Sequence, residues 1–238
     1  MKYITLFEQQ TAFDNAKSTL DKPNMSLVTE TGNVYSLSVG GGVTYEYVDL
    51  GLSVKWAKCN VGAEKETDAG LYFAWGETTG YTASQVGTDK QFSSSDYKYG
   101  NSSSNLTKYN QSDGKTVLES TDDAAAQIMG GDWRMPTQTE FQELLDNTDK
   151  LWTTINGVNG YKFTSIKEGY QNNSIFIPAA GSCYGGSVRD VGSYGNVWSS
   201  SLFASNPGNA WNLNFSSGDC SMSYSGRYSG RSVRGVRK

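Results

Sequence analysis

Three cysteine thiols, at positions 59, 183 and 220, are the most nucleophilic groups in this 238-residue chain. A thiolate can attack a substrate or bind a soft metal, but each role needs a neighbour that stabilises the thiolate. Histidine is a common neighbour of this kind, and the sequence contains none. The three cysteines also lack zinc-site spacing and the even number expected of a disulfide framework. We therefore expect that the protein is not an enzyme.

Carboxylates offer little more chemistry. Pairs such as Asp122 and Asp123 are adjacent in sequence, so their side chains diverge on a helix or strand and acid–base catalysis is not indicated. Calcium would need several converging oxygen ligands. Residues 181–238 contain only two acids, Asp190 and Asp219. The sequence predicts no cofactor and leaves open a structural calcium ion elsewhere.

Tyr, Ser, Asn and Gly form the third chemically useful group, and they make up 33 of the 58 residues from 181 to 238. Antibody loops use the same types, because Tyr gives wide contact at low entropic cost and the small residues give adaptable hydrogen bonds. We expect this segment to present a ligand-binding surface. The alternative is that its Ser and Gly residues form solvated connections, which is the more common role of any single Ser or Asn.

Alternation within this segment predicts which side chains face outward. Trp211, Leu213 and Phe215 should face the core, which places Asn212 and Asn214 outside. The alternation ends after residue 215, so residues 216–228 are predicted to form an irregular loop. An aromatic anchor buried in a partner could contribute about 1–2 kcal/mol. The predicted ligand-binding residues are Tyr184, Tyr194, Ser201, Phe203, Ser205, Asn206, Asn209, Asn212, Asn214, Ser216, Asp219, Cys220, Ser221, Ser223, Tyr224 and Tyr228.

The charge is unevenly distributed. The net charge is −4, which argues against a nucleic-acid partner, yet residues 181–238 carry six bases and two acids. We favour the interpretation that these arginines pair with carboxylates of the same domain. A patch for an acidic ligand is the minority interpretation.

Residues 1–38 have the pattern of a small separate α+β module. A strand is predicted over residues 2–7, a helix over 11–20 with Thr11 as its N-cap, and a hairpin around 31–33. Gly40 to Gly42 lie in a linker over 39–44, and the main domain spans 45–238. So small a unit would be marginal alone, so we expect it to attach to a partner or to copies of itself.

The main domain has a clear helix start and several predicted strands. Thr137 and Glu140 form a capping box, and a helix from there should bury the stripe Phe141, Leu144 and Leu145. "GVNGYKFTSI" and "NSIFIPAAG" predict paired strands, and "GNVWSSSLF", "NAWNLNF" and "RSVRGVR" predict further strands. Residues 80–114 have few aliphatic side chains and are predicted to form a long surface excursion. Val54, Trp56 and Val61 are predicted core residues.

These segments resemble a known family. "WRMPTQTEFQELL" and "GRSVRGVR" are similar to the helix start and terminal strand of the formylglycine-generating-enzyme-like branch of the C-type lectin fold. "YVDLGLSVKWAKCNVGA", "GLYFAWGE" and "VWSSS" further resemble paralogous domains of gut anaerobes and their phages. The resemblance covers residues 45–238 and implies an α+β C-type lectin-like fold. It also implies that Trp198, Ser199, Arg231 and Arg234 are framework, with carbonyl partners for the arginines or carboxylate partners among Asp122, Asp123, Asp132 and Glu140.

Some members of this group are variable proteins of diversity-generating retroelements, in which adenine-directed mutagenesis rewrites C-terminal codons. Residues 1–38 resemble, over a shorter match, N-terminal modules of phage structural proteins. The resemblance implies a tail-fibre or virion receptor-binding protein whose partner is a host-cell surface protein or glycan. Residues 1–38 would join virion components, and a homotrimer is natural for a fibre tip by analogy. The expected location is the virion, after synthesis in the bacterial cytoplasm.

Other functions stay open at this point. A fixed bacterial surface adhesin is weakened because "MKYITLFEQQ" does not resemble a signal peptide, and no stretch predicts membrane insertion. The segments "NPGN" and "AWNLN" only weakly resemble the calcium-binding motifs of calcium-dependent lectins. Calcium-free glycan binding through Tyr and Trp stacking remains open. An oxidase related to formylglycine-generating enzymes, which use two cysteines on copper, would need Cys183 and Cys220 to lie close together.

Overall fold

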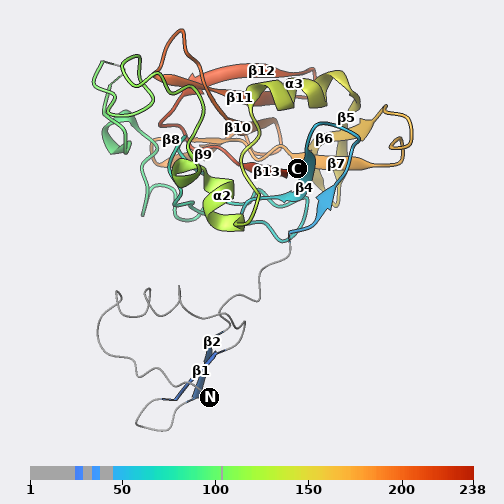
Figure 1. The fold of residues 1–238 in the computed structure, drawn as a ribbon, viewed down its shortest axis with the longest axis horizontal. Coiled ribbons are helices and arrows are strands. Elements are labelled where there is room, and N and C mark those ends of the chain that lie inside the picture. The colour runs from blue at the N-terminus through green and yellow to red at the C-terminus, as the bar shows by residue number, and fades with distance from the viewer. Residues whose placement is uncertain (1–24, 29–33, 38–44, 103) are drawn as a thin grey trace. The chain divides into compact units, whose positions relative to one another are not determined.

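A computed structural model describes residues 25–28, 34–37, 45–102 and 104–238 (Figure 1). The chain divides into two compact units, Met1–Thr44 and Tyr45–Lys238. In the first, β1 (Met25–Val28) and β2 (Val34–Leu37) pair antiparallel, as the hairpin prediction requires. The predicted strand over 2–7, the helix over 11–20 and the linker over 39–44 lie outside the described residues.

One sheet of the second unit joins its two ends. β4 (Lys55–Asn60) lies between β3 (Tyr47–Val48) and the C-terminal strand β13 (Arg234–Arg237), and both pairings are antiparallel. Val54, Trp56 and Val61 are buried, as predicted. The last strand of the chain therefore closes the domain against its first strands.

The best-predicted region is the helix α3 (Gln138–Asp146) and the sheet that follows it. Thr137 and Glu140 form the predicted capping box, and Phe141, Leu144 and Leu145 are buried. β5 (Thr148–Ile155), β6 (Val158–Ser165) and β7 (Ser174–Pro178) then form an antiparallel sheet, which confirms the predicted strand pair. Local signals sufficed because capping, periodicity and short turns all act between near neighbours in sequence.

A third sheet holds most of the predicted binding residues. β11 (Asn209–Ser216) lies between β10 (Tyr194–Leu202) and β12 (Asp219–Gly226). The predicted irregular loop over 216–228 is wrong, because β12 pairs with β11 along its whole length. Its side chains are mostly half-buried on both faces, so the Ser-rich sequence shows no apolar alternation. A small hairpin, β8 (Ser182–Tyr184) with β9 (Ser187–Arg189), precedes this sheet.

Hydrophobic cores lie on both sides of the third sheet. Leu213 and Phe215 pack in one core with Phe141 of α3, which lies along this sheet in Figure 1. Trp198 and Ala210 point the other way and pack in a second core around Trp75. β10 and β11 are therefore covered on both faces, whereas β12 is an edge strand.

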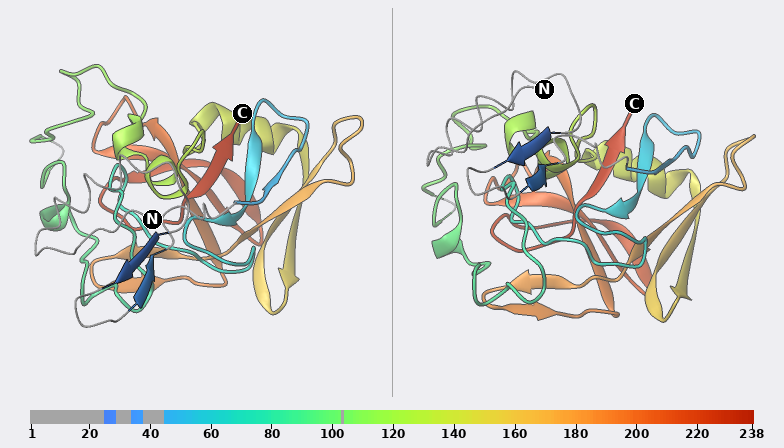
Figure 2. Two further views of the ribbon diagram at one scale, coloured as in Figure 1. Left: turned by 60° about the horizontal axis from the view of Figure 1, so that its bottom comes forward. Right: turned by 90° about the horizontal axis from the view of Figure 1, so that it is seen from below.

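Residues 80–114 are not a mere surface excursion, in contrast to the prediction. Phe92, Tyr97, Tyr99 and Tyr109 are buried in the second core, although the segment has little regular structure beyond the 3-10 turn η1 (Ser94–Asp96). Tyr97 and Tyr99 donate their hydroxyls to the carbonyls of Trp75 and Gly76, so their polar ends are satisfied. Aromatic rings here replace the aliphatic side chains that the prediction relied on. Figure 2 shows this green segment beside the red C-terminal strands.

The predicted α+β, C-type lectin-like fold is wrong. The described part of the chain is mostly antiparallel sheet. Its helices are α2 (Ala124–Met129), α3, η1 and η2 (Ser120–Asp122), and all are short. The capping box marks a single nine-residue helix and does not set the class of the whole domain. Within the described residues, no helix is long and apolar enough to cross a membrane.

Candidate functional site

One face of the third sheet is lined by amide and hydroxyl side chains. Residues opposite each other on paired strands point to the same side. Asn214 pairs with Asn196 and Ser221, and Asn212 pairs with Ser223. We call this side the polar face; it consists of Asn196, Asn212, Asn214, Ser216, Asp219, Ser221, Ser223 and Ser225. Asn214 and the four serines are half-buried and Asp219 is exposed, so the face opens toward the edge strand β12.

Asn212 does not face solvent, in contrast to the prediction. Its side chain is 0% exposed, and neither amide atom has a hydrogen-bond partner among the described residues. The cause is its place on the central strand beside Trp198, where the second core covers the sheet. The alternating pattern correctly placed Asn212 on the face opposite Leu213. It could not show that a hydrophobic core covers each of the two faces at this position.

A buried arginine organises the polar face. Arg231 donates to the side-chain oxygen of Asn196 and, over 2.5 Å, to the hydroxyl of Ser225. Asn214 donates to the same Asn196 oxygen over 2.8 Å. The guanidinium lies 4.9 Å from the Trp198 ring, and burial lowers the pKa of Arg231 to about 10. Arg231 thus remains charged at neutral pH. Its hydrogen bond holds the side-chain amide of Asn196 in place, and that amide in turn accepts from Asn214.

The arginines rarely pair with carboxylates. Arg234 is buried and donates to the side-chain oxygen of Asn60 and to three backbone carbonyls. Arg237 reaches Asp132 at 2.9 Å, whereas Glu140 pairs with Arg134. The favoured interpretation of carboxylate pairing therefore holds for Arg237 alone among the C-terminal arginines of the described chain. The framework positions of Arg231 and Arg234 fit the prediction, with neutral oxygen partners.

Three aromatic rings form a cluster on the other face. Phe203 stacks on Tyr224 with ring centroids 4.0 Å apart, and Trp211 packs edge-on against both rings. Tyr224 is 50% exposed, and Phe203 and Trp211 are half-buried. Trp211 was predicted in the core; it lies instead at the surface end of the stripe whose other members, Leu213 and Phe215, are buried. The cluster offers a preformed apolar surface.

Further tyrosines of the C-terminal third lie outside the aromatic cluster. Tyr194 is exposed at the start of β10, opposite Ser216. Tyr184 on β8 is exposed and packs against Tyr228 with centroids 6.0 Å apart. The guanidinium carbon of Arg189 lies over the Tyr184 ring, 5.4 Å from its centroid. These contacts hold the rings in place without burying them.

Cys183 and Cys220 are not brought together as a reactive pair. Cys183 is buried in the second core, whereas Cys220 packs on the first and faces away from the polar face, opposite Phe215. Burial raises the pKa of each thiol to about 12 and so disfavours the thiolate. None of the cysteines forms a disulfide, and the described residues contain no group of three or more His, Cys, Asp or Glu suited to a metal.

The remaining predicted residues lie where β10 leads into β11. The Ser201 hydroxyl accepts from the backbone N–H of Gln138, so it supports the start of α3. Ser205 is exposed in the connecting loop. Asn206 accepts from the backbone N–H of Gly208 over 3.2 Å, and Asn209 begins β11. Asn206 and Asn209 lie beside the 80–114 segment, which no sequence pattern had linked to them.

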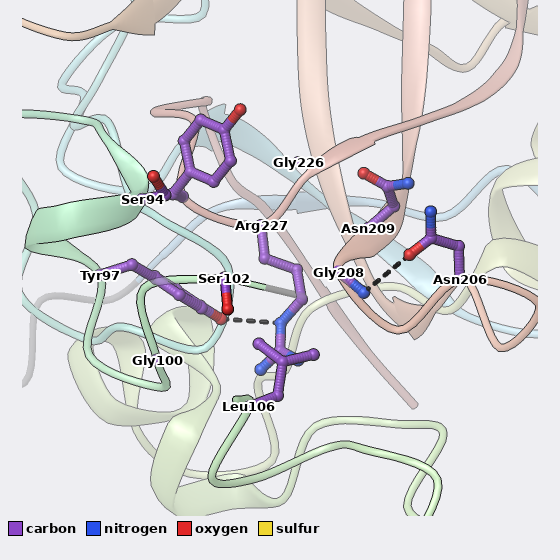
Figure 3. A pocket seen from close by; sticks show the side chains of 11 residues that line it. Ser94, Tyr97, Gly100, Ser102, Leu106, Asn206, Gly208, Asn209, Gly226 and Arg227 are labelled. Atoms are coloured by element: carbon purple, nitrogen blue, oxygen red, sulfur yellow. Dashed lines mark hydrogen bonds between the residues drawn. The ribbon is translucent and has the colours of Figure 1, made fainter. Parts of the chain in front are cut away.

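That meeting place is a pocket of about 250 Å³ (Figure 3). Asn206 and Asn209 stand on one side, and Ser94, Tyr97, Ser102 and Leu106 come from the other. Of the predicted residues, Asn206, Asn209 and Tyr228 line it. The residues from 94 to 106 were missed because only tertiary folding brings the 80–114 segment here, and no local pattern signals it. The full lining is Ser94, Tyr97, Gly100, Ser102, Leu106, Asn206, Gly208, Asn209, Gly226, Arg227 and Tyr228.

Arg227 forms the floor of this pocket and ties its walls together. Its side chain is 1% exposed, and Nε donates to the Tyr97 hydroxyl over 2.8 Å. The two terminal nitrogens donate to the carbonyls of Lys108, Tyr109 and Pro207. Four aromatic rings surround the guanidinium, the nearest being Trp75 at 4.8 Å. The arginine therefore fixes the pocket's shape rather than offering a free charge.

Comparison with known proteins shows a match to one protein family. A family model described as the Lcl C-terminal domain matches residues 47–237. No curated protein and no solved structure matches the chain.

Proposed function

Because the chain belongs to the Lcl C-terminal domain family, with a match that spans most of its second unit, we propose that it is a receptor-binding display protein. The ligand would be held by surfaces of the C-terminal third, namely the polar face, the aromatic cluster on the opposite face of the sheet, and the pocket that Asn206, Asn209 and Tyr228 help to line. Binding is proposed without catalysis and without a required cofactor.

The observation that carries this proposal is the placement of the exposed aromatic side chains. The described tyrosines that are more than about a third exposed are Tyr47, Tyr184, Tyr194 and Tyr224. Three of these four lie within residues 181–238. Tyr194 and Tyr224 lie on the third sheet and Tyr184 lies on the β8–β9 hairpin, each with a Ser residue within two positions in sequence. Exposed tyrosines among such small polar residues are the composition of a recognition surface, since a tyrosine side chain loses little entropy on binding.

We further propose that this surface belongs to a variable protein of a diversity-generating retroelement. Several suspected variable residues lie on the edge strand β12 and belong to neither core, among them Ser221, Ser223 and Tyr224. Substitution there would change the surface and leave the framework of Trp198, Arg227 and Arg234 intact. The setting proposed for the protein is a phage tail fibre or virion, with residues 1–38 as the attachment module and a homotrimer as the assembly.

Two experiments test these two levels. Fluorescently labelled protein should bind cells of a host strain, and Tyr184→Ala or Tyr224→Ala should weaken binding about tenfold without a matching loss of thermal stability. Tyr47→Ala is the control, because Tyr47 is similarly exposed but lies outside the C-terminal third. If all three variants bind equally well, this surface is not the receptor site.

Sequencing the locus across isolates tests the retroelement. Changes should concentrate in codons for residues 182–229 and at adenines of a neighbouring template repeat. Variation no higher there than in "GGDWRMPT", with no reverse-transcriptase gene nearby, would instead indicate a fixed binding domain such as a bacterial surface adhesin.

A further inference from the structure

We propose that the pocket above Arg227 and a second hollow beside it bind an uncharged oligosaccharide, with one sugar unit in each. This inference rests on the proposed function in assuming that the protein binds an external ligand. It goes further by assigning a ligand class and residues outside the C-terminal third.

The second hollow is contiguous with the first. It has a volume of about 340 Å³, and its lining is Ser104, Leu106, Asn110, Gln111, Ser112 and Pro207. Leu106 lines both hollows, and Pro207 lies between Asn206 and Gly208 of the first. The first hollow is smaller than the range of about 300–1,000 Å³ typical of pockets for drug-sized ligands, and the second lies at the lower end of that range. Each is thus suited to a single ring, and the pair to two linked rings.

The lining favours a ligand without charge. Among the described residues, Arg227 is the only charged side chain that lines either hollow, and its three nitrogens already donate to the Tyr97 hydroxyl and three backbone carbonyls. An anion would have to displace these bonds to reach the guanidinium. A third hollow, lined by Glu77, Lys90, Asp96 and Lys98, shows the contrast, because charged groups dominate it.

The available hydrogen-bonding groups suit sugar hydroxyls. Within the described chain, the side chains of Asn209 and Gln111 form no hydrogen bond with other residues, and each amide can donate and accept. The Asn206 oxygen is engaged by Gly208, which leaves its NH₂ group as a donor. Sugar hydroxyls need donors and acceptors side by side, which amides and serines provide. Leu106 and the Tyr228 ring give apolar surface for the C–H face of a sugar.

Arg227 makes the site preformed. It holds residues 97, 108 and 109 on one side and Pro207 on the other, so the walls need not order themselves on binding. Preorganisation lowers the entropic cost of association. Weak individual sugar contacts can then add up to measurable affinity.

The test is saturation-transfer NMR and calorimetry on the full chain. The probes are neutral disaccharides (lactose, maltose, cellobiose and mannobiose), their monosaccharides, and two charged probes, sialyllactose and a heparin disaccharide. At least one neutral disaccharide should bind more tightly than its monosaccharide. Asn209→Ala should weaken it about five- to tenfold, the loss of one or two hydrogen bonds. Gln111→Ala should remove the advantage of the disaccharide over the monosaccharide.

Thr79→Ala, in the charged hollow, is the matched control and should bind like the parent. The proposal is overturned if no neutral probe binds, if a charged probe binds these residues more tightly, or if Thr79→Ala is as damaging as Asn209→Ala. If no neutral sugar binds but the labelled protein still binds host cells, only the proposed ligand class is wrong. If a neutral sugar binds but the protein binds no host cells, the proposed receptor-binding function is contradicted instead.

Discussion

Arg227 donates from Nε to the hydroxyl of Tyr97 over 2.8 Å, although the two residues lie 130 positions apart in the chain. The bond joins the end of β12 to the 80–114 segment. The same tyrosine donates to the carbonyl of Trp75, so one phenol group links three segments. The pocket exists because these segments are held together at this point.

Replacing Arg227 should therefore destabilise the whole domain. Arg227→Met keeps much of the volume but leaves the Tyr97 hydroxyl and three carbonyls without their donor. Loss of a buried, hydrogen-bonded charge network costs about 3 kcal/mol or more. Denaturant unfolding should show this loss of unfolding free energy. Arg189→Met, at an exposed arginine, should change it by less than about 0.5 kcal/mol; equal losses would contradict the role given to Arg227.

Gly195 should not tolerate a side chain. It lies on β10 opposite Phe215, and an added Cβ would overlap the Phe215 ring, which is itself buried. Gly195→Ala is expected to reduce the unfolding free energy by about 1–3 kcal/mol through overpacking. Gly218→Ala is the matched control, because a Cβ there meets nothing within 4 Å. Thermal unfolding of the two variants should separate them clearly, and similar midpoints would refute the close contact.

The buried amide of Asn212 should contribute little to stability. Asn212→Leu removes two polar atoms that have no hydrogen-bond partner among the described residues and keeps a similar shape, so the unfolding free energy should stay level or rise by about 1 kcal/mol. Asn196→Leu is the contrast, since it takes the acceptor away from both Arg231 and Asn214 and should cost about 1–3 kcal/mol. Equal losses in chemical denaturation would show that Asn212 does have a stabilising partner.

Acid should weaken the fold through Asp122. Burial alone would raise the pKa of this carboxyl, but hydrogen bonds from Lys108 and Tyr109 outweigh it and hold the pKa well below its ordinary value of 3.8. A lowered folded-state pKa gives stability that is present above the unfolded value and lost as the pH falls toward the folded one. The unfolding free energy should thus decline below about pH 4, and less steeply in Asp122→Asn.

Asp149→Asn is the control for this titration, because Asp149 is exposed and forms no ion pair within the described residues. Denaturant curves between pH 5 and pH 2 supply the measurement. If Asp122→Asn and the parent protein lose stability in parallel over that interval, Asp122 is not the group responsible.

Short-range signals in the sequence were reliable guides to structure. The capping box at Thr137 and the β6–β7 pair follow from contacts among near neighbours, and the structure has both. The fold class was predicted wrongly. One helix signal and a set of segments similar to a known family led to a predicted α+β fold, whereas the described chain is mostly antiparallel sheet. The edge strand β12 was missed, since half-buried Ser residues on both faces give no period of two.

The candidate site was predictable only in part. The C-terminal composition indicated exposed tyrosines at 184, 194, 224 and 228; the first three rings are exposed, whereas Tyr228 is half-buried. Nothing in the composition could show that Asn212 would be covered by the core around Trp198. The pocket depends on hydrogen bonds from Arg227 to residues 118 to 130 positions away, and such contacts leave no local pattern.

The pocket's two sides come from distant stretches of the gene. Asn206, Asn209 and Tyr228 are encoded within the stretch open to the proposed mutagenesis, whereas Ser94, Ser102 and Leu106 are encoded far upstream. Rewriting the downstream codons would alter one wall and leave the other as inherited. Descendants of a single ancestor would then differ in the partner that they bind most tightly, but they would share the chemical preference set by the unchanged wall. A diversified population would therefore bind chemically related ligands rather than unrelated ones.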